Sequence, residues 1–361
     1  MRRLLLPLAL IGACIIVDAS PNALAFEFAQ AAVVDSRKPV AHLMAPEARI
    51  DEVDLSSGQV LATSTQGARP LLLYDTTLLA QAEPHEQSDS LRLVGLNAKD
   101  LDVIFGVDVP LPAGVHPSID DRLGSSFHAG ARLDAGGIVV QWRSVERRIT
   151  GAPTNEPARI AAGWARIEPN TGRLSSAGDG EAPVREEDLP AAVRELAHSG
   201  ALANKPCRVD DVISAIQYGE EGGATNAVLR RWRGQTGEAL PAVKLFGSEL
   251  TFRSFSADCR YLLASRAMDG WKWSIYSMAT GDKIAELHMP APAAQFFIRN
   301  DSLYYLVPAT VVRAGGQLKI DQPRRLSAID LKTGAELWSR PIRETAYLGP
   351  YPASRPNALA R

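Results

Sequence analysis

Few side chains in this sequence have the types and spacing that catalysis requires. Asp100 and Asp102 are separated by one residue, so on a strand both carboxylates would share a face, where such a pair can perform acid–base chemistry. A solvated strand face gives the same pattern. No two of the six histidines have the i, i+4 spacing of a helical zinc site, and the chain has no serine-nucleophile elbow, phosphate-binding loop or EF-hand loop. We therefore assign no catalytic, cofactor-binding or metal-binding residue.

A basic cluster around one tryptophan is the candidate partner-binding site. Arg230, Arg231 and Arg233 surround Trp232. Arginine and tryptophan are enriched among the residues that dominate binding energy at protein interfaces, and guanidinium groups also bind anions. The alternative is a solvated strand face whose arginines pair with acidic neighbours.

Two cysteines, Cys207 and Cys259, lie in the body of the chain. In an oxidising compartment they can form a disulfide, which would close a loop of about 50 residues and stabilise the fold by roughly 4 kcal/mol. Two buried free thiols are the alternative, because neither cysteine belongs to a CxxC or another metal-like spacing.

The first 25 residues have the features of a secretory signal peptide. Two arginines at positions 2–3 precede an apolar run over residues 4–17, and a small-x-small site at residues 23–25 precedes Phe26. The run is too short to cross the roughly 30 Å of a bilayer core, and no later stretch is long and apolar enough to do so. We expect a signal peptide over residues 1–25 and a mature chain beginning at Phe26.

The leader also contains a second pattern, which makes the localisation a choice between two. Residues 11–14, Ile-Gly-Ala-Cys, look like a bacterial lipobox in which Cys14 would carry the lipid. Cleavage before Phe26 predicts a periplasmic or secreted protein, whereas lipidation of Cys14 predicts a membrane-anchored lipoprotein.

The overall composition is that of an ordinary globular protein. The 361 residues allow one large or two medium domains. Lys and Arg number 39 against 41 Asp and Glu, for a formal net charge of -2, so no global field attracts the chain to nucleic acid or anionic lipid. We therefore expect no nucleic-acid partner.

A short pattern recurs five times along the chain: an apolar strand, a polar residue, two variable residues, Ser/Thr-Gly, and a second apolar strand. Glycine adopts a positive φ without steric cost and Ser, Thr and Asp side chains satisfy turn amides, so each copy predicts a β-hairpin. The turn glycines are Gly58, Gly172, Gly237, Gly281 and Gly334.

The spacing of the repeat predicts the fold. The last three turn glycines are 44 and 53 residues apart, which matches one four-stranded propeller blade of about 40 to 50 residues. Residues 91–107 supply a degenerate strand pair in the longest interval, and residues 137–145 form another candidate strand. We predict an all-β β-propeller over residues 26–345, with about seven four-stranded blades and a range of six to eight.

The last copy of the repeat carries a resemblance to a known family. Residues 328–338 match the AxDxxTGxxxW tryptophan-docking motif of pyrroloquinoline-quinone-type propeller repeats, through Asp330, Thr333, Gly334 and Trp338. Residues 255–287 resemble a WD-repeat blade, with Cys259 where that family has glycine. The chain thus resembles quinoprotein-like or WD-repeat-like β-propellers. In that motif the tryptophan packs one blade against the next.

The resemblance does not extend to the quinone chemistry. The docking position holds tryptophan only at Trp338; in the other copies it holds Ala62, Ser176, Pro241 and Ala285. No segment resembles a quinone-stacking or calcium-ligand signature. We expect no cofactor, with pyrroloquinoline quinone and calcium as the alternative.

Two segments depart from the all-β pattern. The polar insertion over residues 178–211 contains an amphipathic stretch at 189–199 with helical spacing, which is either a cap on the propeller edge or a partner-contacting element. Residues 346–361 contain three prolines and little periodicity, and predict an extended or disordered tail, which can also form a closing strand with the N-terminal segment.

These patterns favour a non-enzymatic secreted or periplasmic propeller that acts as a protein-binding or scaffold module for a protein or peptide. The alternative is a propeller enzyme related to quinoprotein dehydrogenases that binds pyrroloquinoline quinone. Because one fold hosts many functions, the architecture alone does not decide between these classes.

Overall fold

The computed structural model describes residues 25–346, with gaps at 86–87, 122–124, 135–136, 147–157, 181–188, 204–205, 222–223, 248–250, 268–269, 293–294 and 315–316. The predicted signal peptide, with the candidate lipid acceptor Cys14, therefore lies outside the described residues apart from position 25, and so does the predicted tail apart from position 346.

Consecutive segments of the first half of the chain form three antiparallel sheets. The first sheet contains β1 (Ala25–Phe28), β2 (Ala32–Asp35), β3 (Val40–Ala45), β4 (Arg49–Asp54) and β5 (Val60–Ser64). The second contains β6 (Arg69–Tyr74), β7 (Thr77–Gln81), β8 (Ser90–Asn97) and β9 (Val103–Pro110). The third contains β10 (Ser125–Asp134), β11 (Gly137–Glu146), β12 (Arg159–Ile167) and β13 (Leu174–Asp179).

Three more sheets follow in the second half, after the helix α1 (Ala191–His198). The fourth contains β14 (Cys207–Val209), β15 (Val212–Glu221), β16 (Ala224–Arg233) and β17 (Ala239–Gly247). The fifth contains β18 (Thr251–Phe255), β19 (Tyr261–Ala267), β20 (Trp271–Ser277) and β21 (Lys283–Met289). The sixth contains β22 (Phe296–Arg299), β23 (Ser302–Val307), β26 (Arg325–Asp330) and β27 (Glu336–Pro341).

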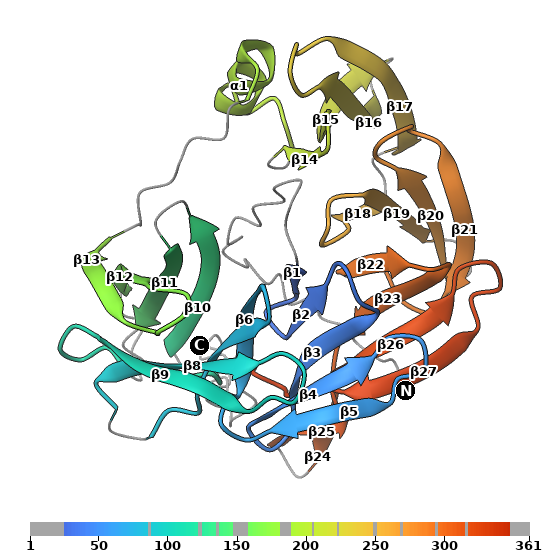
Figure 1. The fold of residues 1–361 in the computed structure, drawn as a ribbon. Coiled ribbons are helices and arrows are strands. Elements are labelled where there is room, and N and C mark those ends of the chain that lie inside the picture. The colour runs from blue at the N-terminus through green and yellow to red at the C-terminus, as the bar shows by residue number, and fades with distance from the viewer. Residues whose placement is uncertain are drawn as a thin grey trace, which may run out of the picture.

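The six sheets are arranged around a ring, in the order of the chain (Figure 1). The protein is therefore a β-propeller. The described residues form six blades, which lies within the predicted range of six to eight and below its centre of seven. Division of the chain by a constant blade length overestimated the number because the third blade, the region of α1 and the sixth blade all contain additional residues.

The predicted hairpins are confirmed at all five positions. Each turn glycine has a φ between 69° and 84° and lies in the turn between the last two strands of its sheet. The strand pair predicted at 91–107 is β8 and β9, and the strand predicted at 137–145 is β11. The β8–β9 turn contains no glycine; Leu101 takes the positive φ there.

Most blades pack between two others, whereas in the described residues no hydrophobic cluster joins the third sheet to the fourth, whose free face α1 covers. Leu262 and Leu263 on β19 point to opposite faces of the fifth sheet; Leu262 packs in a cluster with the fourth sheet and Leu263 in a cluster with the sixth. The first and sixth sheets share a cluster that contains Phe28 and Phe297, whose rings meet edge to face at 5.1 Å. Contacts between side chains therefore hold the blades together.

The ends of the ring meet without a shared strand. β1 pairs with β2 inside the first sheet, and β27 completes the sixth sheet. The predicted closing strand belongs to residues 346–361, which lie outside the described residues apart from position 346, so it stays a prediction. Backbone hydrogen bonds from Arg343 N to Met44 O (2.9 Å) and from Asp121 N to Thr345 O (2.7 Å) hold the C-terminal segment against the first sheets.

The predicted insertion is shorter than expected and contains the predicted helix. β13 extends to Asp179 and β14 begins at Cys207, so both ends of the 178–211 range belong to sheets. Helix α1 starts two residues later and ends one residue earlier than the predicted range of 189–199. Its buried residue Val193 packs against Ile213 and Trp232 of the fourth sheet. In the described residues α1 covers the fourth sheet, which is the role of a cap on the propeller edge.

Cys207 and Cys259 form a disulfide, with 5.6 Å between their Cα atoms. The bond joins the first strand of the fourth sheet to the turn between β18 and β19 in the fifth. Cys259 has a φ of 59° at the position where the WD-type repeat has glycine, so the thiol and the left-handed backbone occur at one residue.

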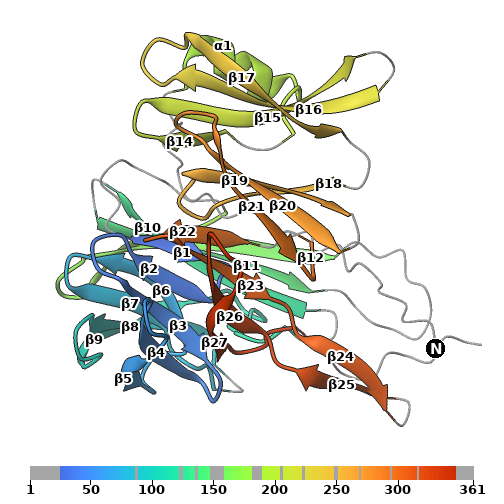
Figure 2. The ribbon, with the colours of Figure 1, turned by 90° about the vertical axis from the view of Figure 1, so that its right-hand side faces the viewer.

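The sixth sheet is interrupted by a hairpin that the repeat pattern did not predict. β24 (Thr310–Ala314) and β25 (Gln317–Gln322) form a separate two-stranded sheet between β23 and β26. Figure 2 shows this hairpin projecting beyond the sixth sheet. Within the described part of the chain, no helix is long and apolar enough to cross a membrane.

Candidate functional site

The docking motif at Asp330 forms a tight turn that presents a glycine to the neighbouring blade. Asp330 Oδ1 accepts hydrogen bonds from Thr333 N at 2.7 Å, Thr333 Oγ1 at 2.9 Å and Lys332 N at 3.0 Å, and the backbone N–H of Gly334 donates to Asp330 O at 2.8 Å. These bonds to the carboxylate hold the pKa of Asp330 below its usual range.

Trp338 packs on the equivalent turn of the first sheet. Its indole Nε1 donates to Leu55 O at 2.9 Å, and Tyr304 Oη donates to the same carbonyl at 2.9 Å. The ring lies against Gly58, where an added Cβ would be only 2.7 Å from the indole carbons. Gly58 therefore serves as the flat platform on which the indole rests. We call this contact between the sixth and first sheets the closing junction.

Other junctions place different side chains on the same kind of platform. Phe105 on β9 lies against Gly172 of the third sheet, and Ala62 packs in the cluster that contains Leu101 of the second. Between the third and fourth sheets, Pro190 at the start of α1 lies against Gly237, with 2.8 Å from the proline Cβ to an added Cβ. The platform is therefore a structural feature that side chains of several residue types cover.

The junction between the fourth and fifth sheets is filled by an arginine. Arg231 Nη1 donates to Ala279 O at 2.9 Å, and its Nη2 and Nε donate to Pro241 O at 2.8 and 3.2 Å. Its guanidinium lies 2.8 Å from an added Cβ at Gly281. Burial holds the pKa of Arg231 below its ordinary value, but the three bonds to carbonyls keep the cation satisfied.

The junction between the fifth and sixth sheets lacks such a side chain, and we call it the open junction. The docking position holds Ala285, and an added Cβ at Gly334 would meet only Leu287, at 3.6 Å. The five turn glycines all lie in described parts of the chain. Among them, Gly334 has the largest distance from an added Cβ to the nearest neighbouring atom. A cavity of about 560 Å³ lies beside it.

Residues from both sheets line this cavity. Its floor is formed by half-buried apolar side chains that also pack on the core between the sheets: Tyr261, Ala285, Ile298 and Leu331. Its rim is formed by polar and exposed side chains: Ile284, Glu286, Arg299, Asn300, Asp301 and Lys332. An apolar floor with a polar rim is the usual anatomy of a binding site.

Both carboxylates of the rim have lysine partners, which for Glu286 lie outside the lining of the cavity. Glu286 accepts from Lys272 at 2.7 Å and from Lys283 at 2.8 Å, and these hydrogen bonds lower the pKa of its carboxyl to about 2. Lys332 lies 3.7 Å from Asp301. The rim therefore presents charges of both signs and selects for neither a strongly acidic nor a strongly basic ligand.

The structure separates the residues of the predicted partner-binding cluster. Arg231 and Trp232 are buried, with 4% and 6% of their surface exposed, since they fill the fourth–fifth junction and the core under α1. The interpretation of these two residues as an exposed binding surface is therefore wrong. Arg230 and Arg233 are exposed and paired, with Gln217 Oε1 at 2.9 Å and Glu238 Oε2 at 3.0 Å.

The predicted carboxylate pair does not lie on a strand. Asp100 and Asp102 belong to the exposed turn between β8 and β9, where Asp100 Oδ1 accepts from Asp102 N at 3.2 Å. The two residues therefore stabilise a turn. In the described part of the chain, no group of three or more His, Cys, Asp or Glu side chains is arranged to hold a metal ion.

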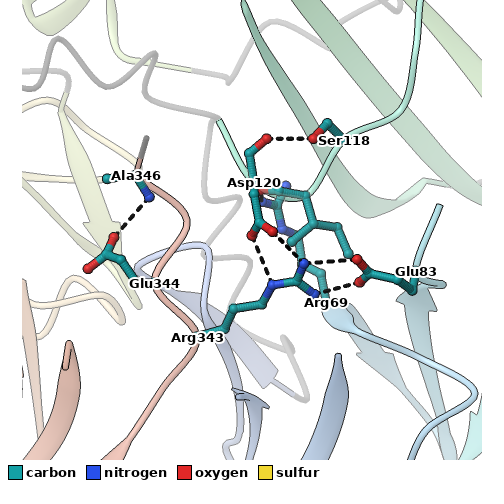
Figure 3. A network of polar contacts seen from close by, with 8 residues as sticks. Arg69, Glu83, Ser118, Asp120, Arg343, Glu344 and Ala346 are labelled. Carbon is teal, nitrogen blue, oxygen red and sulfur yellow. Dashed lines mark hydrogen bonds and ion pairs between the residues drawn. The ribbon is translucent and has the colours of Figure 1, made fainter. Parts of the chain in front are cut away.

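A polar network connects the C-terminal segment to the second blade (Figure 3). Arg343 contacts the carboxylates of Glu83 and Asp120, with 2.9 Å from Nη2 to Glu83 Oε1 and 2.8 Å from Nε to Asp120 Oδ1. These partners raise the pKa of Arg343 against the effect of burial. Behind them, Arg69 Nη2 donates to Ile119 O at 2.8 Å. The network secures the end of the chain.

Two side chains of the first sheet have strongly shifted pKa values. Desolvation raises the pKa of Glu27 on β1, which is partly buried, to about 7, against the opposing effect of Arg69. Burial lowers the pKa of His42 on β3 to about 4. In each case desolvation disfavours the charged form.

Comparisons with known proteins agree with the propeller fold. No family model and no curated protein matches the sequence. Similar solved structures include BamB from Moraxella catarrhalis (12% identity, 88% of this chain and 75% of that chain, TM-score 0.25). They also include a europium-containing methanol dehydrogenase, with 9% identity over 90% of this chain and 80% of that chain and a TM-score of 0.37. The quinohemoprotein alcohol dehydrogenase from Comamonas testosteroni has 10% identity over 90% of this chain and 62% of that chain, with a TM-score of 0.27.

At such identities and TM-scores these matches decide neither the family nor the activity, and the assignment of a propeller rests on the six sheets and their order.

The repeat pattern identified neither Phe105 nor Arg231 as a junction residue, and only Phe105 has a signal in the sequence. Phe105 follows Leu101 by four positions, as Trp338 follows Gly334, but the turn has no glycine to mark it. Arg231 is on the third strand of its blade and reaches the platform from outside the motif, so only the tertiary structure reveals it.

Proposed function

We propose that this protein is a non-enzymatic binding propeller that holds a protein partner outside the cytoplasm. The observation that carries the proposal is the open junction, where a cavity of about 560 Å³ replaces the side chain that fills the other docking positions. Apolar floor residues and paired rim charges support a site for a peptide segment of a partner. The proposal includes no cofactor.

The location in an oxidising compartment is supported by the chain itself. Cys207 and Cys259 pair in the structure, and disulfides persist in the periplasm and in secreted proteins. The sequence features of a signal peptide point the same way. An intact mass equal to that of a chain that begins at Phe26, less two hydrogens for the disulfide, would support a soluble secreted protein. A mass that includes a diacylated Cys14 would show a membrane-anchored lipoprotein.

Photocrosslinking in cells of the native host tests the proposed function. A photoreactive residue at Lys332, on the rim of the cavity, is compared with one at Val312, which is exposed on β24. We expect a discrete protein adduct at position 332 that is absent at 312 and is lost when Ala285→Trp fills the cavity. The absence of an adduct specific to position 332, or its persistence in the filled variant, would overturn the proposal.

A further inference from the structure

The closing and open junctions are built on the same turn. In the first sheet Gly58 N donates to Asp54 O and Asp54 N to Gln59 O, at 2.8 and 2.9 Å; in the sixth, Gly334 N donates to Asp330 O and Asp330 N to Ala335 O, at the same two distances. Each aspartate also accepts from the backbone N–H three residues later. Leu331 therefore corresponds to Leu55.

The two turns differ in what lies on them. The indole of Trp338 covers Gly58 and donates to the carbonyl of Leu55. At Gly334 the corresponding side chain is the methyl group of Ala285, so a platform with the same hydrogen bonds has no ring on it and meets only Leu287, 3.6 Å from an added Cβ. The cavity adjoins this turn, with Ala285 and Leu331 in its lining.

Aromatic rings are the side chains that suit such a platform. Glycine has no Cβ, so a flat ring can rest directly on its backbone, as the rings of Trp338 and Phe105 do on Gly58 and Gly172. Aliphatic side chains can bury a similar area but lack a group that donates to the carbonyl at the Leu55 position. An indole provides both a flat face and one N–H donor.

The remainder of the cavity fits an aromatic side chain on a peptide. Its volume lies within the roughly 300–1,000 Å³ typical of ligand sites, so it accepts a ring together with part of the adjoining chain. Tyr261, Ile298 and Leu331 supply apolar walls. Because the rim charges are already paired, burial of the ring leaves no new unpaired ion.

We propose that the open junction binds an aromatic side chain of the partner, a tryptophan in preference, which takes on Gly334 the place that Trp338 takes on Gly58. This inference rests on the proposed function, since the ring comes from a partner protein. The partner thereby completes the one docking position that the chain leaves unfilled among its turn-glycine platforms.

Isoleucine-methyl NMR of the full mature protein tests the inference, with three probes: N-acetyl-tryptophanamide, N-acetyl-leucinamide and the peptide Gly-Ser-Trp-Ser-Gly. We expect both tryptophan probes to shift the methyl signals of Ile298 and Ile284, with at least tenfold weaker binding of the leucine amide. Equal binding of the leucine and tryptophan amides, or shifts confined to other isoleucines, would overturn the preference for a ring.

Three variants control for folding and for site. Ala285→Trp should abolish the shifts, and Ile284→Glu, at a side chain that is 43% exposed, should do so without disturbing the core. Val312→Trp on the hairpin should bind as the wild type does. Retained binding in Ile284→Glu with an intact spectrum would contradict the assignment to this cavity.

The two proposals fail in different ways. If no tryptophan probe binds while the crosslink at position 332 is still lost in Ala285→Trp, a partner uses the cavity and the aromatic inference is wrong. If the amide binds while the pentapeptide does not, the cavity excludes peptide chains, and the proposal of a partner side chain is wrong.

Discussion

The closing junction and the open junction share a turn and differ in one side chain. Trp338 covers the platform of the first sheet, whereas Ala285 leaves that of the sixth uncovered. The comparison shows that a propeller junction has two separable parts, a platform built by local hydrogen bonds and an occupant supplied by the neighbouring blade. A platform without an occupant remains folded, because its hydrogen bonds are internal to the turn, and it becomes available to another molecule.

Acidic groups in the first sheet and at the open junction differ as well. Glu27 on β1 is partly buried and its pKa rises to about 7, whereas Glu286 at the open junction is paired with two lysines and its pKa falls to about 2. Glu27 therefore changes charge near neutral pH, whereas Glu286 is ionised throughout that range. Desolvation dominates where the blades are packed, and ion pairing dominates where the cavity admits water.

The largest effect should come from removing the ring at the closing junction. Trp338→Ala uncovers the Gly58 platform and removes one of the two donors to the Leu55 carbonyl, and we expect a loss of about 3 kcal/mol in the free energy of unfolding. Chemical denaturation measures it. Ala285→Gly, which removes one methyl at the open junction, is the matched control and should cost less than half as much; equal losses would break the distinction between the junctions.

The second effect depends on pH. The carboxyl of Glu27 loses its proton near 4.5 in the unfolded chain and near 7 in the folded one, so its contribution to stability falls as pH rises from about 4.5 to about 7. Relative to wild type, Glu27→Gln should therefore gain on the order of 2 kcal/mol between pH 4 and pH 8.

Two controls define this pH effect. His42 affects stability with the opposite sign. Burial lowers its pKa to about 4, so its contribution to the free energy of unfolding is lost as pH falls from 6.5 to 4. Only the difference between variant and wild type therefore isolates the effect of Glu27. Glu286→Gln at the open junction should give no change above pH 5. A flat difference between Glu27→Gln and wild type would show that the carboxyl is not desolvated.

A third prediction compares the two platform glycines. Both have a positive φ, of 70° at Gly58 and 73° at Gly334, so alanine at either position carries a strain of about 1 to 2 kcal/mol. At Gly58 the new methyl also meets the indole, which should add about 1 to 3 kcal/mol. Thermal unfolding of Gly58→Ala and Gly334→Ala measures the difference, and identical values would mean that both platforms are equally covered.

The smallest effect should be equal at the two junctions. Asp54→Ala and Asp330→Ala each remove the carboxylate that accepts the turn hydrogen bonds, and we expect the melting temperature to fall by roughly 2 °C in each variant. Parallel scanning calorimetry measures both. A much larger fall at one position would show that the platforms are not equivalent.

Local patterns determined much of the fold. The Ser/Thr-Gly copies predicted five hairpins, and the 44- and 53-residue intervals predicted blades, because a glycine with positive φ and its capping side chain act within a few residues. The helix at 191–198 followed from its apolar spacing. The pairing of Cys207 with Cys259 was one of two open alternatives, since sequence separation does not say whether two thiols meet.

The occupants of the platforms were decided by the tertiary structure. Arg231 and Trp232 form a basic, aromatic cluster in the sequence, yet strand alternation and the neighbouring blade bury both and leave Arg230 and Arg233 outside. Ala285 in the sequence shows only that a tryptophan is missing. Whether Leu287, an arginine or a helix end fills the space depends on side chains that arrive from another blade.

The sequence by itself therefore determined the turns, the strands and the propeller class, because these depend on contacts between residues close in the chain. Only the tertiary structure decided which junctions are filled and which one is open, because the distance between an alanine on β21 and a glycine after β26 is set by the packing of two separate sheets.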